Sequence, residues 1–139
     1  MWTLVISLIT NFLCFGVTYL MLPKMNALEF VVMVILVPAI CNGLILFKGR
    51  LIKNSKTITI TFLSILTTIA YIIFGFFSLR GGRIQIFANN NSYYDDNVSV
   101  SINENINSVS NIVFVLLIQF SFMALARFFY EKNKKSKEM

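Results

Sequence analysis

Three amide side chains, those of Asn11, Asn42 and Gln119, stand inside long apolar stretches of the sequence. An amide that leaves water needs new hydrogen-bond partners. Thr67 and Thr68 place hydroxyl groups near the middle of another apolar stretch. We therefore expect these side chains to face neighbouring helices and to bond across them. Such bonds are worth about 0.6 kcal/mol on average within a membrane and roughly 2 kcal/mol at most.

Side chains that could carry a reaction are scarce. His is absent, and no ionisable residue lies in the middle of an apolar stretch, so the carboxylate or His chains of proton pathways are missing. Asp95 and Asp96, next to Tyr93 and Tyr94, are the densest reactive group, but they belong to a polar segment without rigid elements to position them. The sequence predicts no catalytic, cofactor-binding or metal site, and hence a non-enzymatic protein.

The elements that must position the amides are long apolar segments. Of the 139 residues 57% are hydrophobic and 13% charged, against about 45–50% and about 25% in soluble domains. A helix needs roughly 20 residues to cross a hydrocarbon core of about 30 Å. Cys14 and Cys41 fall within these segments and are interpreted as small hydrophobic side chains without a disulfide. The sequence predicts an all-α membrane protein, a single domain over residues 1–139, with transmembrane helices at about 2–22, 28–47, 57–79 and 112–130.

Pro38 interrupts the second apolar segment. Because proline has no N–H, the carbonyl of Val34 loses its usual donor, and we expect a kink there. Ala39 and Gly43 are small residues four positions apart, a spacing that lets another helix approach closely. We interpret this region as a helix-packing site, with a ligand or partner site as the alternative.

Residues 80–111 form a polar loop, rich in Asn and Ser, between the third and fourth helices. The alternation at 98–102 is compatible with a short strand, but so small an excursion lacks a core. We expect partial disorder here. Arg80 and Arg83, at the start of the loop, are expected to contact lipid phosphate.

The charge of +6 is unevenly placed: nine of the twelve Lys and Arg residues lie between the second and third helices or from the end of the fourth onward. Loops rich in Lys and Arg stay in the cytoplasm, so we expect a multi-pass protein of the cell membrane with both termini and the tail 131–139 inside.

Basic residues beside apolar segments do not form the aqueous face that nucleic acid requires. The expected partners are the lipid bilayer, its anionic headgroups, and a membrane-protein partner or a second copy. The residues expected to make the inner contacts are Lys48, Arg50, Lys53, Lys56, Arg127, Lys132, Lys134, Lys135 and Lys137.

The first third of the chain carries two runs, Ser7-Leu-Ile-Thr-Asn11-Phe-Leu-Cys-Phe-Gly16-Val and Val34-Ile-Leu-Val-Pro38-Ala-Ile-Cys-Asn-Gly43-Leu-Ile-Leu-Phe-Lys48. Over about the first fifty residues this sequence resembles the small Msa membrane proteins (modulators of SarA) of low-GC Gram-positive bacteria. The resemblance implies an integral membrane protein that influences virulence regulation and biofilm traits. It implies no catalytic residues, and the Asn-rich outer loop departs from the pattern.

Three functions fit these features. The first is an accessory or regulatory protein whose outer loop senses and whose basic inner surface engages a partner or anionic lipid. The second is an immunity protein against a membrane-active peptide or secreted toxin. The third is a small pore or transporter subunit that oligomerises along the Ala39 and Gly43 face.

Overall fold

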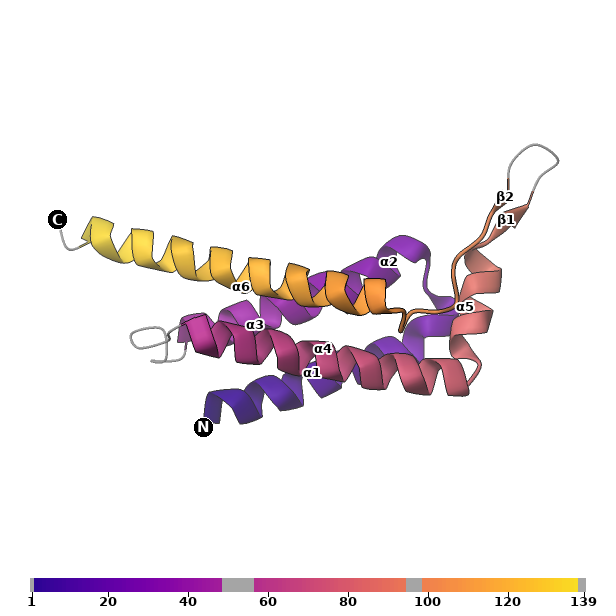
Figure 1. Cartoon of the computed structure of the whole chain (residues 1–139), viewed down its shortest axis with the longest axis horizontal. Helices are drawn as coiled ribbons and strands as arrows, with labels where there is room; N and C mark the ends of the chain where they lie inside the picture. The colour runs from indigo at the N-terminus through magenta and orange to yellow at the C-terminus, as the bar shows by residue number, and fades with distance from the viewer. Residues whose placement is uncertain (1, 49–56, 95–98, 138–139) are drawn as a thin grey trace.

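The computed structural model describes residues 2–48, 57–94 and 99–137, and within them the chain is mainly helical (Figure 1). The elements in the first half are α1 (Trp2–Met21), the short 3-10 helix η1 (Leu22–Lys24), α2 (Ala27–Val31), the π-helical turn η2 (Val32–Leu36) and α3 (Val37–Lys48). Those in the second half are α4 (Thr57–Arg80), α5 (Arg83–Asn91), the strands β1 (Tyr93–Tyr94) and β2 (Ser99–Val100), and α6 (Val109–Lys137).

Four helices in the described part of the chain are long and apolar enough to cross a membrane. The spans are Leu4–Lys24, Ala27–Leu46, Thr57–Arg80 and Val109–Phe129. The chain is therefore an all-α, four-helix, multi-pass membrane protein, which confirms the predicted fold class. Its second span is continuous through α2, η2 and α3, so Pro38 lies inside one helix that contains an irregular turn.

The second span begins with a capping box formed by Asn26 and Glu29. The Asn26 side chain accepts the Glu29 N–H at 2.8 Å, and the Glu29 carboxylate accepts the Asn26 N–H at 3.0 Å. This reciprocal arrangement satisfies two N–H groups that a helix start otherwise leaves unpaired. Glu29 thus serves the start of the helix, at the membrane boundary.

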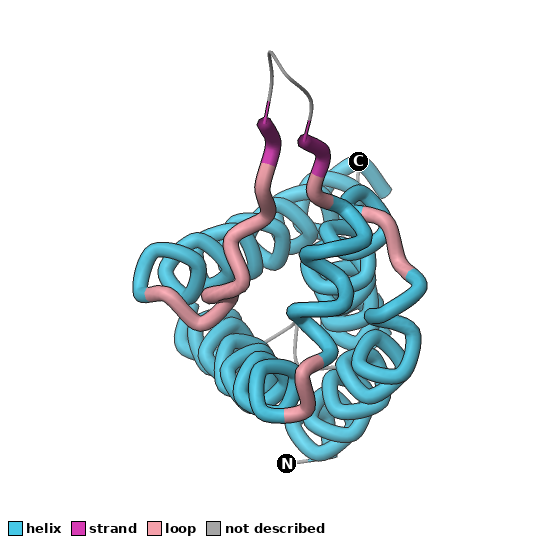
Figure 2. The backbone as a smooth tube through the Cα atoms, turned by 90° about the vertical axis from the view of Figure 1, so that its right-hand side faces the viewer, coloured by secondary structure: helices cyan, strands magenta, loops and turns pink. Residues whose placement is uncertain are grey.

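The four spans lie side by side in a ring. Helix α1 packs against α3 and α4, and α6 packs against the same two helices, so α3 and α4 face each other diagonally across the bundle. Figure 2 shows this ring from one end. The first residues of α1, the end of α3, the start of α4 and the end of α6 lie at one end of the bundle, and α5 and the strands lie at the other (Figure 1).

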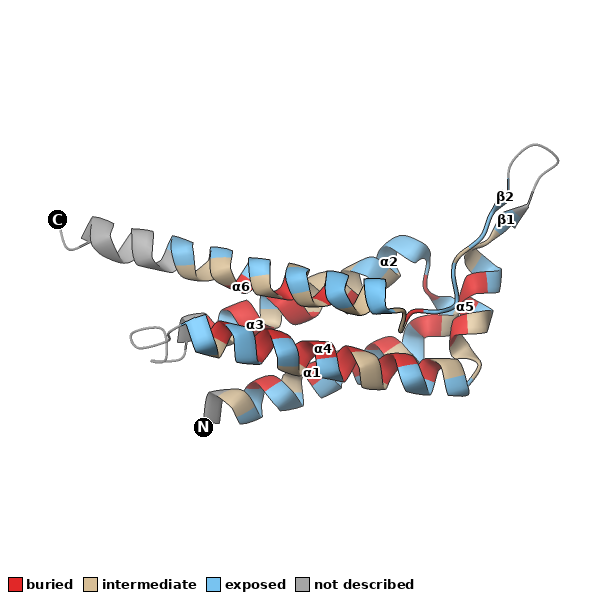
Figure 3. Cartoon of the chain, in the orientation of Figure 1, coloured by how far each residue is buried: buried red, intermediate tan, exposed pale blue. Residues whose placement is uncertain are grey.

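Figure 3 shows that buried residues face the middle of the bundle and exposed residues its outside. Many of the exposed residues are large and apolar. One cluster, near α5, includes the rings of Phe15, Phe74 and Phe87. A smaller cluster at the opposite end contains Leu46, Ile60, Leu63 and Met123. Exposed side chains on the outer faces include Leu20, Leu44 and Phe128. An apolar exterior of this kind is suited to contact with lipid chains.

The second half of the chain differs from the expectation in two places. The segment expected to be a polar loop contains regular structure among its described residues: α5 is followed by two short antiparallel strands, with Tyr93 opposite Val100. The fourth span, Val109–Phe129, lies close to the expected 112–130. Helix α6 continues beyond it to Lys137, so the described part of the tail is helical.

Candidate functional site

A cluster of four buried polar side chains joins α1, α3 and α4 inside the bundle. Asn42 is its centre. Its Oδ1 accepts hydrogen bonds from Ser7 Oγ at 2.5 Å and from Asn11 Nδ2 at 3.3 Å. Its Nδ2 donates to Thr67 Oγ1 at 2.8 Å and to Asn11 Oδ1 at 3.4 Å. Each of the four side chains is at most 1% exposed.

The cluster satisfies its own hydrogen-bonding groups. Asn11 Nδ2 also donates to the Ser7 carbonyl at 2.9 Å, and Thr67 Oγ1 donates to the Leu63 carbonyl at 2.9 Å. Thr67 lies ten residues into α4, about 15 Å along the helix, which is half of the ~30 Å hydrocarbon core. Asn11 and Asn42, which were expected to face other helices, do so in this cluster, and its geometry serves helix packing.

Gln119 of α6 bonds to the backbone of the second span instead of to the amide cluster. Its Nε2 donates to the Ile35 carbonyl at 3.0 Å. Ile35 lies in the π-helical turn, three residues before Pro38, where the regular pattern of backbone bonds changes. Irregular backbone inside a membrane must find other partners. Gln119 supplies one, so it links α6 to the second span.

The remaining helix-packing candidates are Thr68, which bonds within its own helix, and Ala39 and Gly43, which lie on α3. Thr68 is buried, but its hydroxyl donates to the Ser64 carbonyl of its own helix at 2.8 Å. Ala39 is 2% exposed, and a methyl group built at Gly43 would meet the Ala126 side chain of α6 at 4.0 Å. Gly43 therefore faces α6 within the chain, and an alanine there would make only an ordinary van der Waals contact. The pore hypothesis relied on this face for oligomerisation, and at Gly43 it is occupied by α6.

Cys14 and Cys41 face each other between α1 and α3. Both thiols are free and partly exposed, and they are near enough to interact electrostatically. In the described ranges there is no group of three or more His, Cys, Asp or Glu residues that could hold a metal ion.

Those expected inner-surface residues that the structure describes lie at the end of the bundle where α1 begins and α6 ends. Lys48 is the last residue of α3, and Arg127 is half-buried on α6. Arg50, Lys53 and Lys56, like Asp95 and Asp96 of the outer segment, lie outside the described residues. The final turns of α6 carry Lys132, Lys134, Lys135 and Lys137.

At the opposite end, α5 forms a cap that is bonded to the connection between α1 and α2. Asn91 Nδ2 donates to the Met25 carbonyl at 3.0 Å, and Asn91 Oδ1 accepts the Ala27 N–H at 2.9 Å. Asn90 Nδ2 donates to the Pro23 carbonyl at 3.0 Å. Two side chains of α5 itself, Ile84 and Phe87, are at most 1% exposed, so both polar and apolar contacts hold the cap.

Arg83 belongs to this cap. Its Nη1 donates to the carbonyls of Tyr19 and Leu20 at 3.2 and 3.3 Å, and its guanidinium lies 4.5 Å from the centre of the Tyr19 ring. The last carbonyls of a helix favour a cation. Arg83 Nη1 is thus engaged at the end of α1, whereas Arg80 is exposed, and the expectation that these two residues contact lipid phosphate stays a prediction.

The segment between β2 and α6 is bonded to α4. Tyr71 Oη donates to the Ile106 carbonyl at 2.6 Å, and Asn107 Nδ2 donates to the Ile72 carbonyl at 3.1 Å. Gly75 makes room for Asn107, because a methyl group at Gly75 would overlap the Asn107 side chain. This segment is thus fixed by specific contacts and closes over the end of the bundle.

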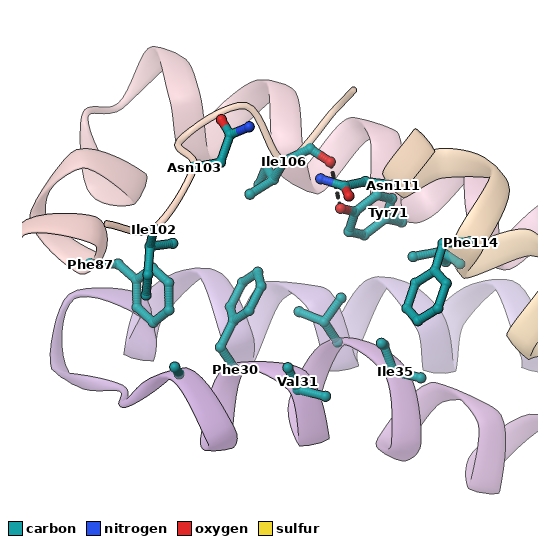
Figure 4. Close-up of a pocket in the computed structure, with 13 residues that line it drawn as sticks. Phe30, Val31, Ile35, Tyr71, Phe87, Ile102, Asn103, Ile106, Asn111 and Phe114 are labelled. Carbon is teal, nitrogen blue, oxygen red and sulfur yellow. Dashed lines mark hydrogen bonds between the residues drawn. The ribbon is translucent and has the colours of Figure 1, made fainter. Parts of the chain in front are cut away.

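Beneath the cap and this segment lies a cavity of about 280 Å³, which we call the outer pocket (Figure 4). Phe30 and Ile35 of the second span form one wall, and Phe114 of α6 forms the facing wall. Tyr71 of α4 and Phe87 of α5 complete it. Asn103 and Asn111 are at its rim. The outer pocket is thus an apolar space whose walls come from both halves of the chain.

Several of these functional contacts involve residues that the sequence interpretation missed. Ser7 could have been found, because Ser7, Asn11, Cys14 and Thr18 recur at spacings of four, three and four, which place them on one helix face. Asn90 and Asn91 carried no such signal, since their partners are backbone carbonyls distant in sequence.

The helices and the cluster define the class of this protein as a small polytopic membrane protein with a closed four-helix bundle and an ordered cap. The chain matches no protein-family model, no curated protein and no solved structure. The resemblance to the Msa proteins stays a prediction.

Proposed function

We propose that the chain is a non-enzymatic accessory or regulatory protein of the cell membrane that receives a signal at its capped end. The proposal includes an orientation in which both termini and the connection between α3 and α4 are cytoplasmic. Nine basic residues at that end against three at the other support this orientation through the positive-inside rule. A contribution to virulence-regulator signalling is the form of this function that the Msa resemblance implies.

The observation that carries the proposal is the bonded cap. Asn91 joins α5 to the start of the second span, Arg83 joins it to the end of α1, and Tyr71 joins the following segment to α4. A ligand shifts a conformational equilibrium only if it binds one state better than another. Because these bonds connect the cap and the segment before α6 to three spans, we expect binding at this end to change helix positions at the cytoplasmic end.

The proposed function is tested by replacing residues 93–100 with a short Gly-Ser linker. This change removes the strands but keeps Asn91, Ile106 and Asn107, which hold the cap and the segment before α6. We expect the variant to insert normally and to reproduce the transcript changes of a whole-gene deletion in the native host. A matched control replaces Asn89, an exposed residue of α5, with Ser. A wild-type transcript profile in the linker variant would contradict sensing by the strands.

The proposed orientation has its own test. Single cysteines at Ser101 and Thr57, exposed at opposite ends of the bundle, are introduced into a chain without Cys14 and Cys41. We expect an impermeant maleimide to label position 101 in intact cells and position 57 after permeabilisation alone. The reverse pattern would overturn the orientation.

A further inference from the structure

We propose that the outer pocket binds one acyl chain of a membrane lipid, which enters sideways between α2 and α6. This site is independent of the proposed regulatory role, because it depends on the shape and chemistry of the bundle alone.

The pocket opens toward the surface that faces lipid. Val31 and Phe114, at its mouth, are 50% and 55% exposed, whereas Val34 and Val115, farther in, are each 3% exposed. Helix α6 packs firmly against α3 and α4 but lightly against η2. The second span and α6 therefore leave an opening near the capped end, and the side chains on its two walls face each other across the space (Figure 4).

The depth of the pocket corresponds to one leaflet. On the second span, Ile35 is the lining residue farthest from the capped end. It lies eight residues after Ala27, or about 12 Å along the helix axis. Half of a hydrocarbon core is about 15 Å. The cavity volume of about 280 Å³ is also smaller than the volume of a helix segment of the same length, because a helix with its side chains is about 10–12 Å across. The space suits a single narrow chain.

The chemistry of the walls selects an apolar occupant. Aliphatic and aromatic side chains form most of the lining, and within the described residues the lining contains no charged side chain. The hydroxyl of Tyr71 is bonded to the Ile106 carbonyl. The amides of Asn103 and Asn111 lie at the rim, where the ester and glycerol groups of a lipid would be. An empty apolar cavity forfeits van der Waals contacts on every side, so a hydrocarbon chain is the favoured filling.

The test uses the full chain in nanodiscs of phosphatidylcholine that include a phosphatidylcholine with a diazirine in the middle of one acyl chain. After irradiation, adducts are mapped by peptide mass spectrometry. We expect severalfold more adducts on the peptides containing Phe30, Ile35 and Val115 than on those containing Leu44 and Ile58, which are exposed on the outside of the bundle. Even labelling of all exposed faces would overturn the proposal, since the lipid would then act only as solvent.

Two variants fill the pocket from its mouth, and one is a matched control. Val31→Trp should reduce the adducts at the pocket at least twofold, as should Ala27→Phe if the first variant folds poorly. Val17→Trp is the control, because Val17 is 46% exposed and lies four residues from the end of α1, as Val31 lies four from the start of α2. Equal loss in Val31→Trp and Val17→Trp would contradict a specific site.

A last arm asks which part of the lipid is recognised. Phosphatidylglycerol with the same diazirine chain should give the same labelling, because no charged side chain among the described residues lines the pocket. A strong preference for the anionic lipid would overturn recognition through the chain.

Discussion

Asn11 and Asn42 exchange hydrogen bonds between their side-chain amides, so that each amide donates to and accepts from the other across the interface of α1 and α3. A two-way bond of this kind tolerates little rotation of either helix, because both donors and both acceptors must stay aligned. Asn42 then extends the bonding to Thr67 on α4. The cluster specifies which faces of three helices meet.

The bond from Asn42 to Thr67 should contribute measurably to stability. Thr67→Val keeps the shape of the side chain but removes the acceptor of the Asn42 N–H, so we expect a loss of about 0.6–2 kcal/mol. Thr68→Val is the control, because the Thr68 hydroxyl bonds only within α4 among the contacts described. Unfolding by SDS in mixed micelles compares the two. Equal losses would show that the bond between helices adds nothing.

The native cysteines provide a test of the contact between α1 and α3. Because Cys14 and Cys41 are neighbours across the packed interface of α1 and α3, we expect copper phenanthroline to close an intramolecular disulfide in isolated membranes. The measurement is the loss of labelling by a PEG-maleimide in SDS, restored by a reducing agent. Cys41→Ser should keep Cys14 open to the label. Efficient dimer formation in place of the internal crosslink would contradict the packing.

Two glycines should respond oppositely to alanine. In Gly75→Ala the new methyl group overlaps the Asn107 side chain, which must move and give up its bond to the Ile72 carbonyl. We expect a loss of about 1 kcal/mol or more. Gly16→Ala meets nothing within 4 Å and replaces a poor helix former, so stability should be unchanged or slightly higher. The same SDS assay measures both, and a neutral Gly75→Ala would argue against the docking of Asn107.

The cap should loosen when Asn91 is shortened. Asn91→Ala removes the bonds to the Met25 carbonyl and the Ala27 N–H, so we expect faster hydrogen–deuterium exchange in the connection between α1 and α2. Asn89→Ala, on the exposed side of the same helix, should leave exchange unchanged. Unaltered exchange in Asn91→Ala would show that apolar burial of α5 alone holds the cap.

The spanning helices were predictable because their length and apolarity are local properties of the chain. The requirement that the buried amides of Asn11, Asn42 and Gln119 face other helices was also predictable. The choice of partner was not, since Gln119 meets the Ile35 carbonyl only because the second span has a π-helical turn at that height. Such a turn depends on how neighbouring helices satisfy the freed backbone groups.

The outer segment was mispredicted because its order comes from long-range contacts. A nine-residue helix such as α5 is marginal by itself. Ile84, Phe87 and Ala88 do share one face, but what stabilises that face is the connection between α1 and α2, more than fifty positions away in the sequence. Local composition therefore indicated a loop where packing produces a cap.

The placement of Asn42 also bears on how the protein is assembled as it leaves the ribosome. Chains fold from the N-terminus during synthesis, and the partners Ser7 and Asn11 belong to the first span. The first two helices can therefore enter the bilayer as a pair whose amides are already engaged. One N–H of Asn42 still requires Thr67, so the nascent hairpin keeps a single polar attachment point ready for the third helix.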